Sequence, residues 1–202
     1  NPETLFDRLG KCYIQPKFDG LRCQIHAYQL DGKLVIKMFS RNFEDFTHSF
    51  PDIVEEIEKL YTQGGKKDFI LDSEAIGINL KTGKFLQFGD TMKRKRKHGV
   101  EEFAQNIKMQ VHIFDILYLG EDILENAFED RFEKLGSLLA NYHGEVLKVS
   151  KTDLVESEIE LAKIFEKYVA DGLEGIIAKK VGTIYEPGTR NFDWIKLKRS
   201  TD

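Results

Sequence analysis

The sequence predicts an α+β fold, with two packed, mainly antiparallel sheets flanked by helices. Three observations support this fold class: apolar and polar residues alternate with period two, short apolar runs recur, and helical periodicities fall between them at irregular intervals. A hairpin turn among the strands favours antiparallel pairing over a doubly wound parallel sheet. Since no stretch rich in Gly, Ser or Pro divides the chain, we expect residues 1–202 to form one domain.

The strands are predicted from alternation and from apolar runs. Residues 21–28 alternate as a half-buried strand does, and Asp31-Gly32 is typical of a hairpin turn leading into a second strand at 34–39. Further apolar runs predict buried strands at 69–78, 111–119, 175–178 and 194–197.

The helices are predicted from apolar residues spaced three and four apart. In 50–61 this spacing is accompanied by Pro51 in the first turn and by Gly64-Gly65 beyond the end, as is typical of an amphipathic helix. The same pattern predicts helices at 131–142 and 156–170, the latter ended by Asp171-Gly172.

Composition excludes several classes of protein. The chain has 202 residues, of which 41% are hydrophobic and 15 are Phe, so it can bury a core and is not predicted to be disordered. No apolar run approaches the roughly 20 residues of a membrane helix, and no secretory signal opens the chain. We therefore expect an intracellular protein, cytoplasmic or nuclear, without a membrane partner. Because the first residue is Asn1 rather than Met, we also expect an excised fragment.

The net charge of -4 conceals basic clusters. Residues 93–98 read Lys-Arg-Lys-Arg-Lys-His, and further cations gather between 179 and 199. Such runs fit either a solvated surface or a phosphate-rich partner.

The chemistry starts from Lys17-Phe18-Asp19-Gly20. A lysine before an Asp-Gly turn holds an amine where a ligand can reach it, although this motif alone also fits a surface hairpin. Further motifs follow it in order: Ser40-Arg41-Asn42, Leu71-Asp72-Ser73-Glu74, Phe114-Asp115-Ile116-Leu117-Tyr118, Glu174-Gly175-Ile176-Ile177-Ala178-Lys179 and Asp193-Trp194-Ile195-Lys196-Leu197-Lys198.

This ordered set resembles the motifs of the covalent nucleotidyltransferases, which include ATP-dependent DNA ligases, RNA ligases and mRNA capping enzymes. The resemblance is closest to the adenylation domain of ATP-dependent DNA ligases, particularly over 174–179, 185–190 and 194–198, and it spans about residues 12–199. It implies an ATP-grasp-like nucleotidyltransferase fold and a DNA ligase (ATP) activity that serves replication, repair or recombination.

The resemblance implies that Lys17 attacks the α-phosphate of ATP and then passes AMP to the 5′-phosphate of a DNA nick. Lys196 and Lys198, two apart on a predicted strand, point to one face, as a phosphate clamp requires. As cations beside Lys17 they also favour the neutral amine that attacks.

Other roles follow from the same resemblance. The implied ATP-binding residues are Gln15, Arg22, Arg41, Glu74, Phe114, Lys179, Arg190, Lys196 and Lys198. Glu174 and Glu74 are the implied ligands of Mg²⁺ or Mn²⁺, both of which prefer oxygen donors. The implied contacts with nicked duplex DNA are Arg41, Lys93, Arg94, Lys95 and Arg96. Asp19 is interpreted as shaping the loop.

Gln15 departs from the commonest family pattern, which has Glu two residues before the lysine. The oxygen of the amide can accept from the exocyclic amine of adenine, but its NH₂ can equally donate to O6 of guanine. We expect adenine to be preferred, with more use of GTP than by a Gln15→Glu variant.

The resemblance also implies parts that lie outside the chain: an OB-fold domain after residue 199 of the same polypeptide, and in many members a DNA-binding domain before residue 1. We expect a monomer that seals nicks poorly on its own. The alternatives are an RNA ligase or capping-type nucleotidyltransferase, and a silent module that binds nucleotide or DNA without chemistry. An NAD-dependent ligase would need a four-cysteine zinc site, which Cys12 and Cys23 cannot supply.

Overall fold

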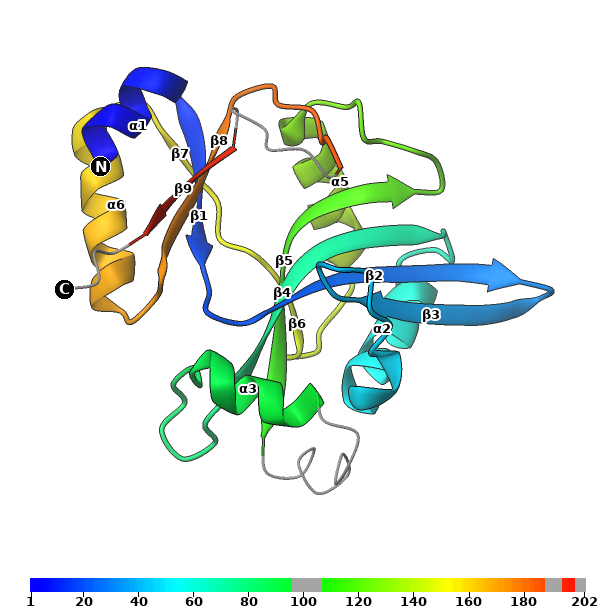
Figure 1. The fold of residues 1–202 in the computed structure, drawn as a ribbon. Helices are drawn as coiled ribbons and strands as arrows, with labels where there is room; N and C mark the ends of the chain where they lie inside the picture. Colours follow the sequence, from blue (N-terminus) through cyan, green and yellow to red (C-terminus); the bar gives the residue numbers. More distant parts are fainter. Residues whose placement is uncertain (96–106, 188–193, 199–202) are drawn as a thin grey trace. The chain divides into compact units, whose positions relative to one another are not determined.

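The computed structural model describes residues 1–95, 107–187 and 194–198, and within these the side chains of 94, 95, 194 and 195 are not described. The chain divides into two compact units, each with its own sheet (Figure 1). The first unit comprises Asn1–Asp19, Leu124–Asp130 and Ser150–Asp202, and the second comprises Gly20–Ile123 and Arg131–Val149.

The first unit contains a four-stranded sheet in the order β7-β1-β8-β9, in which neighbouring strands are antiparallel. Its strands are β1 (Cys12–Lys17), β7 (Asp153–Val155), β8 (Gly175–Lys180) and β9 (Trp194–Lys198). Helices α1 (Pro2–Leu9) and α6 (Glu158–Ala170) pack on each other, α6 against β8 and α1 against β9. The alternate residues Ile14, Ile176 and Ala178 are fully buried.

The second unit contains a five-stranded sheet in the order β3-β2-β4-β5-β6, in which the β5–β6 pair is parallel and the other pairs are antiparallel. Its strands are β2 (Leu21–Leu30), β3 (Lys33–Phe39), β4 (Phe69–Ile78), β5 (Lys108–Leu119) and β6 (Leu147–Val149). Its helices are η1 (Thr47–Ser49), α2 (Pro51–Gln63), α3 (Phe88–Lys95) and most of α5 (Phe128–Leu139).

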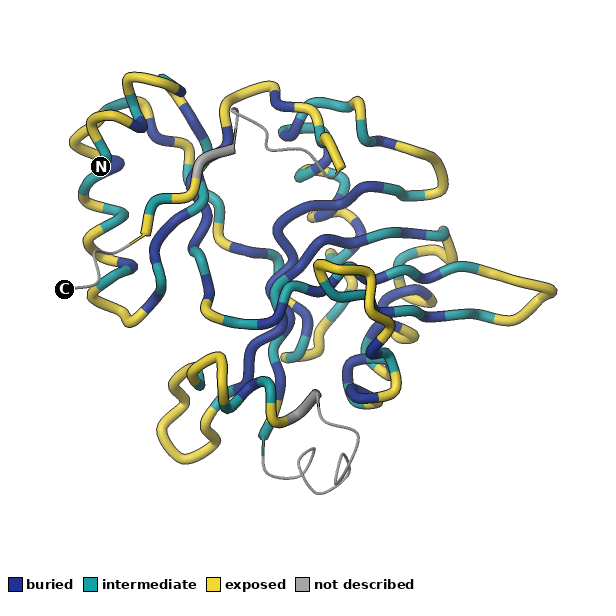
Figure 2. Tube along the Cα trace, in the orientation of Figure 1, coloured by how far each residue is buried: buried dark blue, intermediate teal, exposed yellow. Residues whose placement is uncertain are grey.

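The core of the second unit lies between this sheet and its helices. Ile53, Ile57 and Leu60 of α2 are fully buried, at the spacing of one helical face. Figure 2 shows buried residues along β4 and β5 and exposed residues at the tip of the β2–β3 hairpin. Asp31 and Gly32 at this tip both have positive φ, as a tight hairpin turn requires.

The predicted fold class is confirmed: the structure is α+β with two mainly antiparallel sheets. The strand at 69–78 has the predicted bounds, and β2, β3, β5, β8 and β9 extend beyond theirs by one to three residues. That residues 1–202 form one domain stays a prediction. No helix among the described residues has the length and apolar character needed to cross a bilayer.

All three predicted helices have wrong bounds. The helix predicted at 50–61 runs from Pro51 to Gln63. The helix predicted at 131–142 runs from Phe128 to Leu139; Phe128 is fully buried against the ring of Tyr13, with the centroids 5.3 Å apart. Tyr142 lies beyond the helix, where its hydroxyl donates to Glu56. The helix predicted at 156–170 begins at Glu158, because the hydroxyl of Ser157 accepts from the backbone N–H of Glu160 and caps it.

Candidate active site

The register of the four-stranded sheet gathers the predicted lysines on one face. Lys17, the last residue of β1, lies opposite Gly175 of β8, which in turn pairs with Lys198 of β9. Directly paired residues of antiparallel strands share a face, so Lys17 and Lys198 lie on the same side of the sheet. Gln15 and Lys196, each two residues away along its strand, lie on this side as well. We call this side the lysine face.

A carboxylate joins two of these lysines. The ammonium of Lys17 donates to Oε2 of Glu174 at 2.5 Å, and Nζ of Lys198 lies 3.3 Å from Oε1 of the same carboxylate. Burial alone would raise the pKa of Glu174, but the hydrogen bonds and charges of the two lysines outweigh it and lower that pKa. The result is a partly exposed cluster with two cations around one anion.

Gly175 permits this cluster because β8 and β9 approach closely there. A Cβ on Gly175 would lie 2.0 Å from the carbonyl oxygen of Leu197, a distance at which the backbone would have to move. The glycine therefore sets the spacing at which Lys198 can reach Glu174.

Lys179 also belongs to the lysine face, since it pairs with Tyr13, two residues before Gln15. It is fully buried, and its Nζ lies 4.5 Å from the centroid of the Phe128 ring, which stabilises the charge by a cation–π interaction.

Gln15 is fully buried and has a polar neighbour across the sheet. Its Nε2 donates to Oγ1 of Thr152 at 3.0 Å, and Oγ1 of Thr152 donates to the carbonyl of Ser150 at 3.1 Å. Thr152 thus accepts from the amide while its own proton goes to the backbone.

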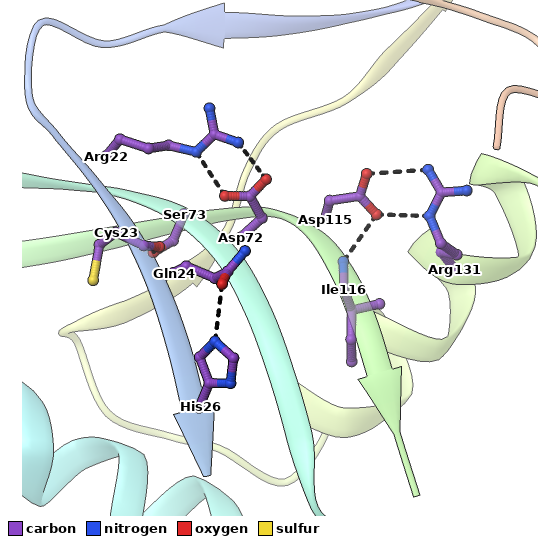
Figure 3. Close-up of polar contacts among 9 residues, drawn as sticks. All are labelled: Arg22, Cys23, Gln24, His26, Asp72, Ser73, Asp115, Ile116 and Arg131. Atoms are coloured by element: carbon purple, nitrogen blue, oxygen red, sulfur yellow. Dashed lines mark hydrogen bonds and ion pairs between the residues drawn. The ribbon is translucent and has the colours of Figure 1, made fainter. Parts of the chain in front are cut away.

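In the second unit, Arg22 is held by Asp72 (Figure 3). Nε and Nη2 of Arg22 donate to the two carboxylate oxygens at 2.6 and 2.5 Å, a bidentate pair across neighbouring strands β2 and β4. The side chain of Asp72 is 1% exposed and that of Arg22 34%. The guanidinium carbon of Arg22 also lies 4.9 Å from the centroid of the Phe114 ring. Phe114 and Arg22, both predicted nucleotide-binding residues, are therefore in contact.

Phe114 lies at an irregularity of β5. Asp72 pairs with Asp115 and the next residue, Ser73, pairs with Ile113, so Phe114 is the extra residue of a β-bulge. Bulges turn a side chain away from the regular pleat and are common beside active sites. Next to the bulge, the carboxylate of Asp115 accepts from the N–H of Ile116 and from the Arg131 guanidinium, and the Asp115–Arg131 ion pair is fully buried (Figure 3).

Other predicted residues of this unit are placed by the same sheet. Glu74 pairs with Arg22 and shares its side of the sheet. Gly20, before β2, lies so close to β4 that a Cβ would be 2.5 Å from the carbonyl oxygen of Ala75. Arg41 is exposed in the turn after β3, where the N–H of Phe43 donates to the carbonyl of Ser40.

The basic run is described in part. Lys93 is on α3, where its ammonium lies 3.1 Å from the carboxylate of Asp90, one turn before it. Arg94 and Lys95 continue this helix, whereas Arg96 and Arg190 lie outside the described residues.

The sequence analysis missed the roles of Asp72, Asp115, Arg131 and Thr152. Asp72 and Asp115 stand within otherwise apolar runs, and a buried carboxylate requires a cationic or hydrogen-bonding partner. That signal was available, but the partners lie 50 and 16 residues away and become evident only with the register.

Comparison with known proteins decides the family. The model of the family described as ATP dependent DNA ligase domain matches residues 1–198. The chain belongs to this ATP-dependent DNA ligase family. It is 44% identical over 199 residues to a probable DNA ligase of Dictyoglomus turgidum, and 36% identical over 201 residues to DNA ligase 2 of Korarchaeum cryptofilum.

These matches cover 98% of this ligase-family chain but 33% and 32% of the two relatives, so the chain spans about a third of their length. Solved structures agree on the fold. A mycobacterial DNA ligase D complexed with ATP and MES has a TM-score of 0.70 at 24% identity, covering 94% of this chain and 56% of its own. The ATP-dependent ligase of bacteriophage T7 in complex with ATP has a TM-score of 0.65 at 19% identity, covering 98% and 64%. The predicted family is confirmed.

Proposed function

We propose that this chain is the adenylation domain of an ATP-dependent DNA ligase and that Lys17 carries the AMP. The observation that carries the proposal is the Lys17–Glu174–Lys198 cluster on the lysine face. A nucleophilic amine stands there beside a second cation, an arrangement that suits attack on a polyphosphate.

The first step is transfer of AMP to the lysine. The neutral Nζ of Lys17, having released a proton to solvent, attacks the α-phosphorus of ATP. A nitrogen–phosphorus bond forms, the bond from the α-phosphorus to the bridging oxygen of the β-phosphate breaks, and pyrophosphate leaves with the electron pair. The second proton of the amine is lost to solvent, which leaves a lysyl-AMP phosphoramidate.

The charges of the lysine face stabilise this transfer. Lys196 and Lys198 neutralise the phosphate oxygens, and Lys179 holds the α-phosphate, since phosphoryl transfer is accelerated mainly by positioning and by charge neutralisation. In the second unit, Glu74 accepts from a ribose hydroxyl and Phe114 stacks on adenine.

The acidic residues fit a divalent ion of the hard, oxygen-preferring kind. Mg²⁺ is commonly bound by one or two carboxylates together with substrate phosphates, and Glu174, whose oxygens face two cations in this structure, offers such a carboxylate. When bound, Mg²⁺ or Mn²⁺ would neutralise charge on the phosphates. We assign Glu174 to this role, with Glu74 as the second candidate ligand.

The later steps need DNA. The 5′-phosphate of a nick attacks the lysyl-AMP, the nitrogen–phosphorus bond breaks and Lys17 is regenerated; the 3′-hydroxyl then attacks the activated phosphate and releases AMP. Arg41 and the basic run from Lys93 are assigned to the DNA backbone, whose contacts fix position without reading sequence. An OB-fold domain of the same polypeptide is proposed to assist both nucleotide transfer and sealing.

The proposal is tested by intact mass spectrometry. The protein is stripped with pyrophosphate and Mg²⁺, incubated with ATP or GTP, and weighed. We expect one AMP adduct that pyrophosphate removes and that Lys17→Ala abolishes. Lys11→Ala is the matched control, because Lys11 precedes the same strand but is exposed and ion-paired with Glu156; it should keep the adduct.

The outcomes separate the proposal from a capping-type enzyme and from a silent module. A GTP adduct in place of AMP would indicate a capping-type enzyme. If no adduct forms, the assay is repeated on a polypeptide extended to include the proposed OB-fold domain. Continued absence of the adduct together with binding to nicked DNA would refute the catalytic proposal and favour a silent binding module.

A further inference from the structure

The amide of Gln15 could read adenine or guanine, depending on which of its two ends faces the base. The oxygen accepts from the exocyclic amine of adenine, and the NH₂ group donates to O6 of guanine. Gln15 lies on the lysine face, two residues before Lys17 on β1. The contact that orients the Gln15 amide therefore influences whether ATP or GTP is preferred.

Thr152 lies where its side chain can fix the orientation of the Gln15 amide. The antiparallel pairing of β1 with β7 matches Cys12 with Val155 and Ile14 with Asp153, and one further step in this register brings Gln15 opposite Thr152. Oγ1 of Thr152 lies 3.0 Å from Nε2 of Gln15. Thr152 is the residue before β7, so this contact continues the register of the β1–β7 pair by one step.

The hydroxyl of Thr152 distinguishes the two ends of the Gln15 amide because it already donates its proton to a backbone carbonyl. Oγ1 donates to the carbonyl of Ser150 at 3.1 Å, and a hydroxyl has a single proton to donate. While that hydrogen bond is kept, the hydroxyl can only accept from Gln15. An amide NH₂ satisfies that acceptor, whereas an amide oxygen placed there would leave two acceptors facing each other in a part-buried contact.

We infer that Thr152 is a specificity-determining residue for the nucleobase, and that it acts by holding the NH₂ of Gln15 so that the amide oxygen reads the base. This inference rests on the proposed function, since it assigns the base contact of that same site. A glutamine in this arrangement presents the acceptor that a glutamate would present, and thus favours adenine over guanine. Thr152 itself is a positioning residue and need not touch the nucleotide.

The test compares ATP with GTP in two readouts. One is the rate of covalent adduct formation at limiting nucleotide; the other is non-covalent affinity for each nucleotide in a Lys17→Ala background. Thr152→Val keeps the shape of the side chain but removes the hydroxyl, and we expect it to lower the ATP-over-GTP preference about tenfold in both readouts. Thr152→Ser retains the hydroxyl and should keep the wild-type preference.

A second background separates orientation from general damage. In Gln15→Glu both side-chain oxygens can accept, so adding Thr152→Val should change the preference less than twofold. An equal loss of preference in that background would overturn the inference, as would an unchanged ratio in the single variant. If wild type forms no adduct even in the polypeptide extended to include the proposed OB-fold domain, but Thr152→Val still alters the binding ratio, the inference stands and the catalytic proposal fails.

Discussion

The buried Asp115–Arg131 ion pair gives the sharpest prediction for stability. Both side chains are fully buried, and the guanidinium reaches the carboxylate through Nε at 2.9 Å and Nη2 at 3.1 Å. In Arg131→Met the length of the side chain is approximately kept but the charge is lost. Asp115 then becomes a buried carboxylate that retains its hydrogen bond from the N–H of Ile116 but has no counter-ion from Arg131.

Breaking one partner of a buried pair costs about 3–5 kcal/mol of unfolding free energy. For a chain of this length each kcal/mol lowers the melting temperature by about 2–4 °C, so we expect a fall of roughly 6–20 °C. Adding Asp115→Asn to Arg131→Met removes the negative charge that Arg131 no longer balances. The amide of Asn keeps a side-chain oxygen that accepts from the N–H of Ile116. The double variant should therefore regain about 1–3 kcal/mol relative to Arg131→Met alone.

The assay is thermal and urea unfolding followed by circular dichroism, with hydrogen exchange of β5 as a local measure. Lys59→Met is the matched control, because it too replaces a helical cation with Met. Unlike Arg131, Lys59 has its acidic neighbours, Glu55 and Glu56, on its own helix. Since Lys59 is half exposed, its loss should cost at most about 1 kcal/mol. The reasoning is wrong if Arg131→Met lowers the free energy of unfolding no more than Lys59→Met does. It is also wrong if Asp115→Asn lowers that free energy equally with and without Arg131.

Two further predictions concern activity. Asp72→Asn weakens the bidentate ion pair that holds Arg22. We expect the protein to stay folded and lysyl-AMP formation to slow about tenfold, because Arg22 is partly exposed and solvent screens part of the lost interaction. An unchanged rate of lysyl-AMP formation at limiting ATP would contradict this role of Asp72. Gly175→Ala places a Cβ against the carbonyl of Leu197, so β9 must shift. Because a displacement of about 1 Å can slow a reaction that depends on positioning about 100-fold, we expect lysyl-AMP formation to slow by about that factor. Gly136→Ala is its control: a Cβ there meets no atom within 4 Å, and Ala in a helix should leave adduct formation unchanged and raise stability slightly.

The parts of the fold that the sequence predicts well are those with a long, regular pattern. The apolar run of β4 is ten residues long and ends where polar residues begin, so its bounds were predicted correctly. β6 and β7 have three residues each, too few for alternation to be recognised. β5 reads as a continuous apolar run because residues 111–117 are all buried. Without alternation in the sequence, the change of register at Phe114 could not be predicted.

The candidate site was predicted as a set of residues rather than as contacts. Lys17 and Glu174 lie 157 residues apart, and Gln15 and Thr152 lie 137 apart. The motifs identify Lys17 and Glu174 but not the contact between them, and of the second pair only Gln15 was predicted. The contacts follow from strand register, which depends on the whole sheet. Thr152 belongs to no motif, and its role follows only from the pairing of β1 with β7.

The motif glycines explain why these contacts are possible. Gly20 was interpreted as a turn residue, yet it is not among the glycines with positive φ. What it provides is a missing Cβ, which lets β2 enter the sheet with its backbone close to Ala75, beside Glu74. Gly175, which does have a positive φ of 157°, also provides a missing Cβ, here for β8 against Leu197, beside Lys198. In each unit, therefore, a glycine lies next to a residue that is assigned to nucleotide binding. Because the glycine has no Cβ, the two backbones can approach there more closely than any other residue would allow. The adjacency of glycine to the functional residue in both motifs therefore follows from packing, and replacing either glycine should displace a strand that carries the chemistry.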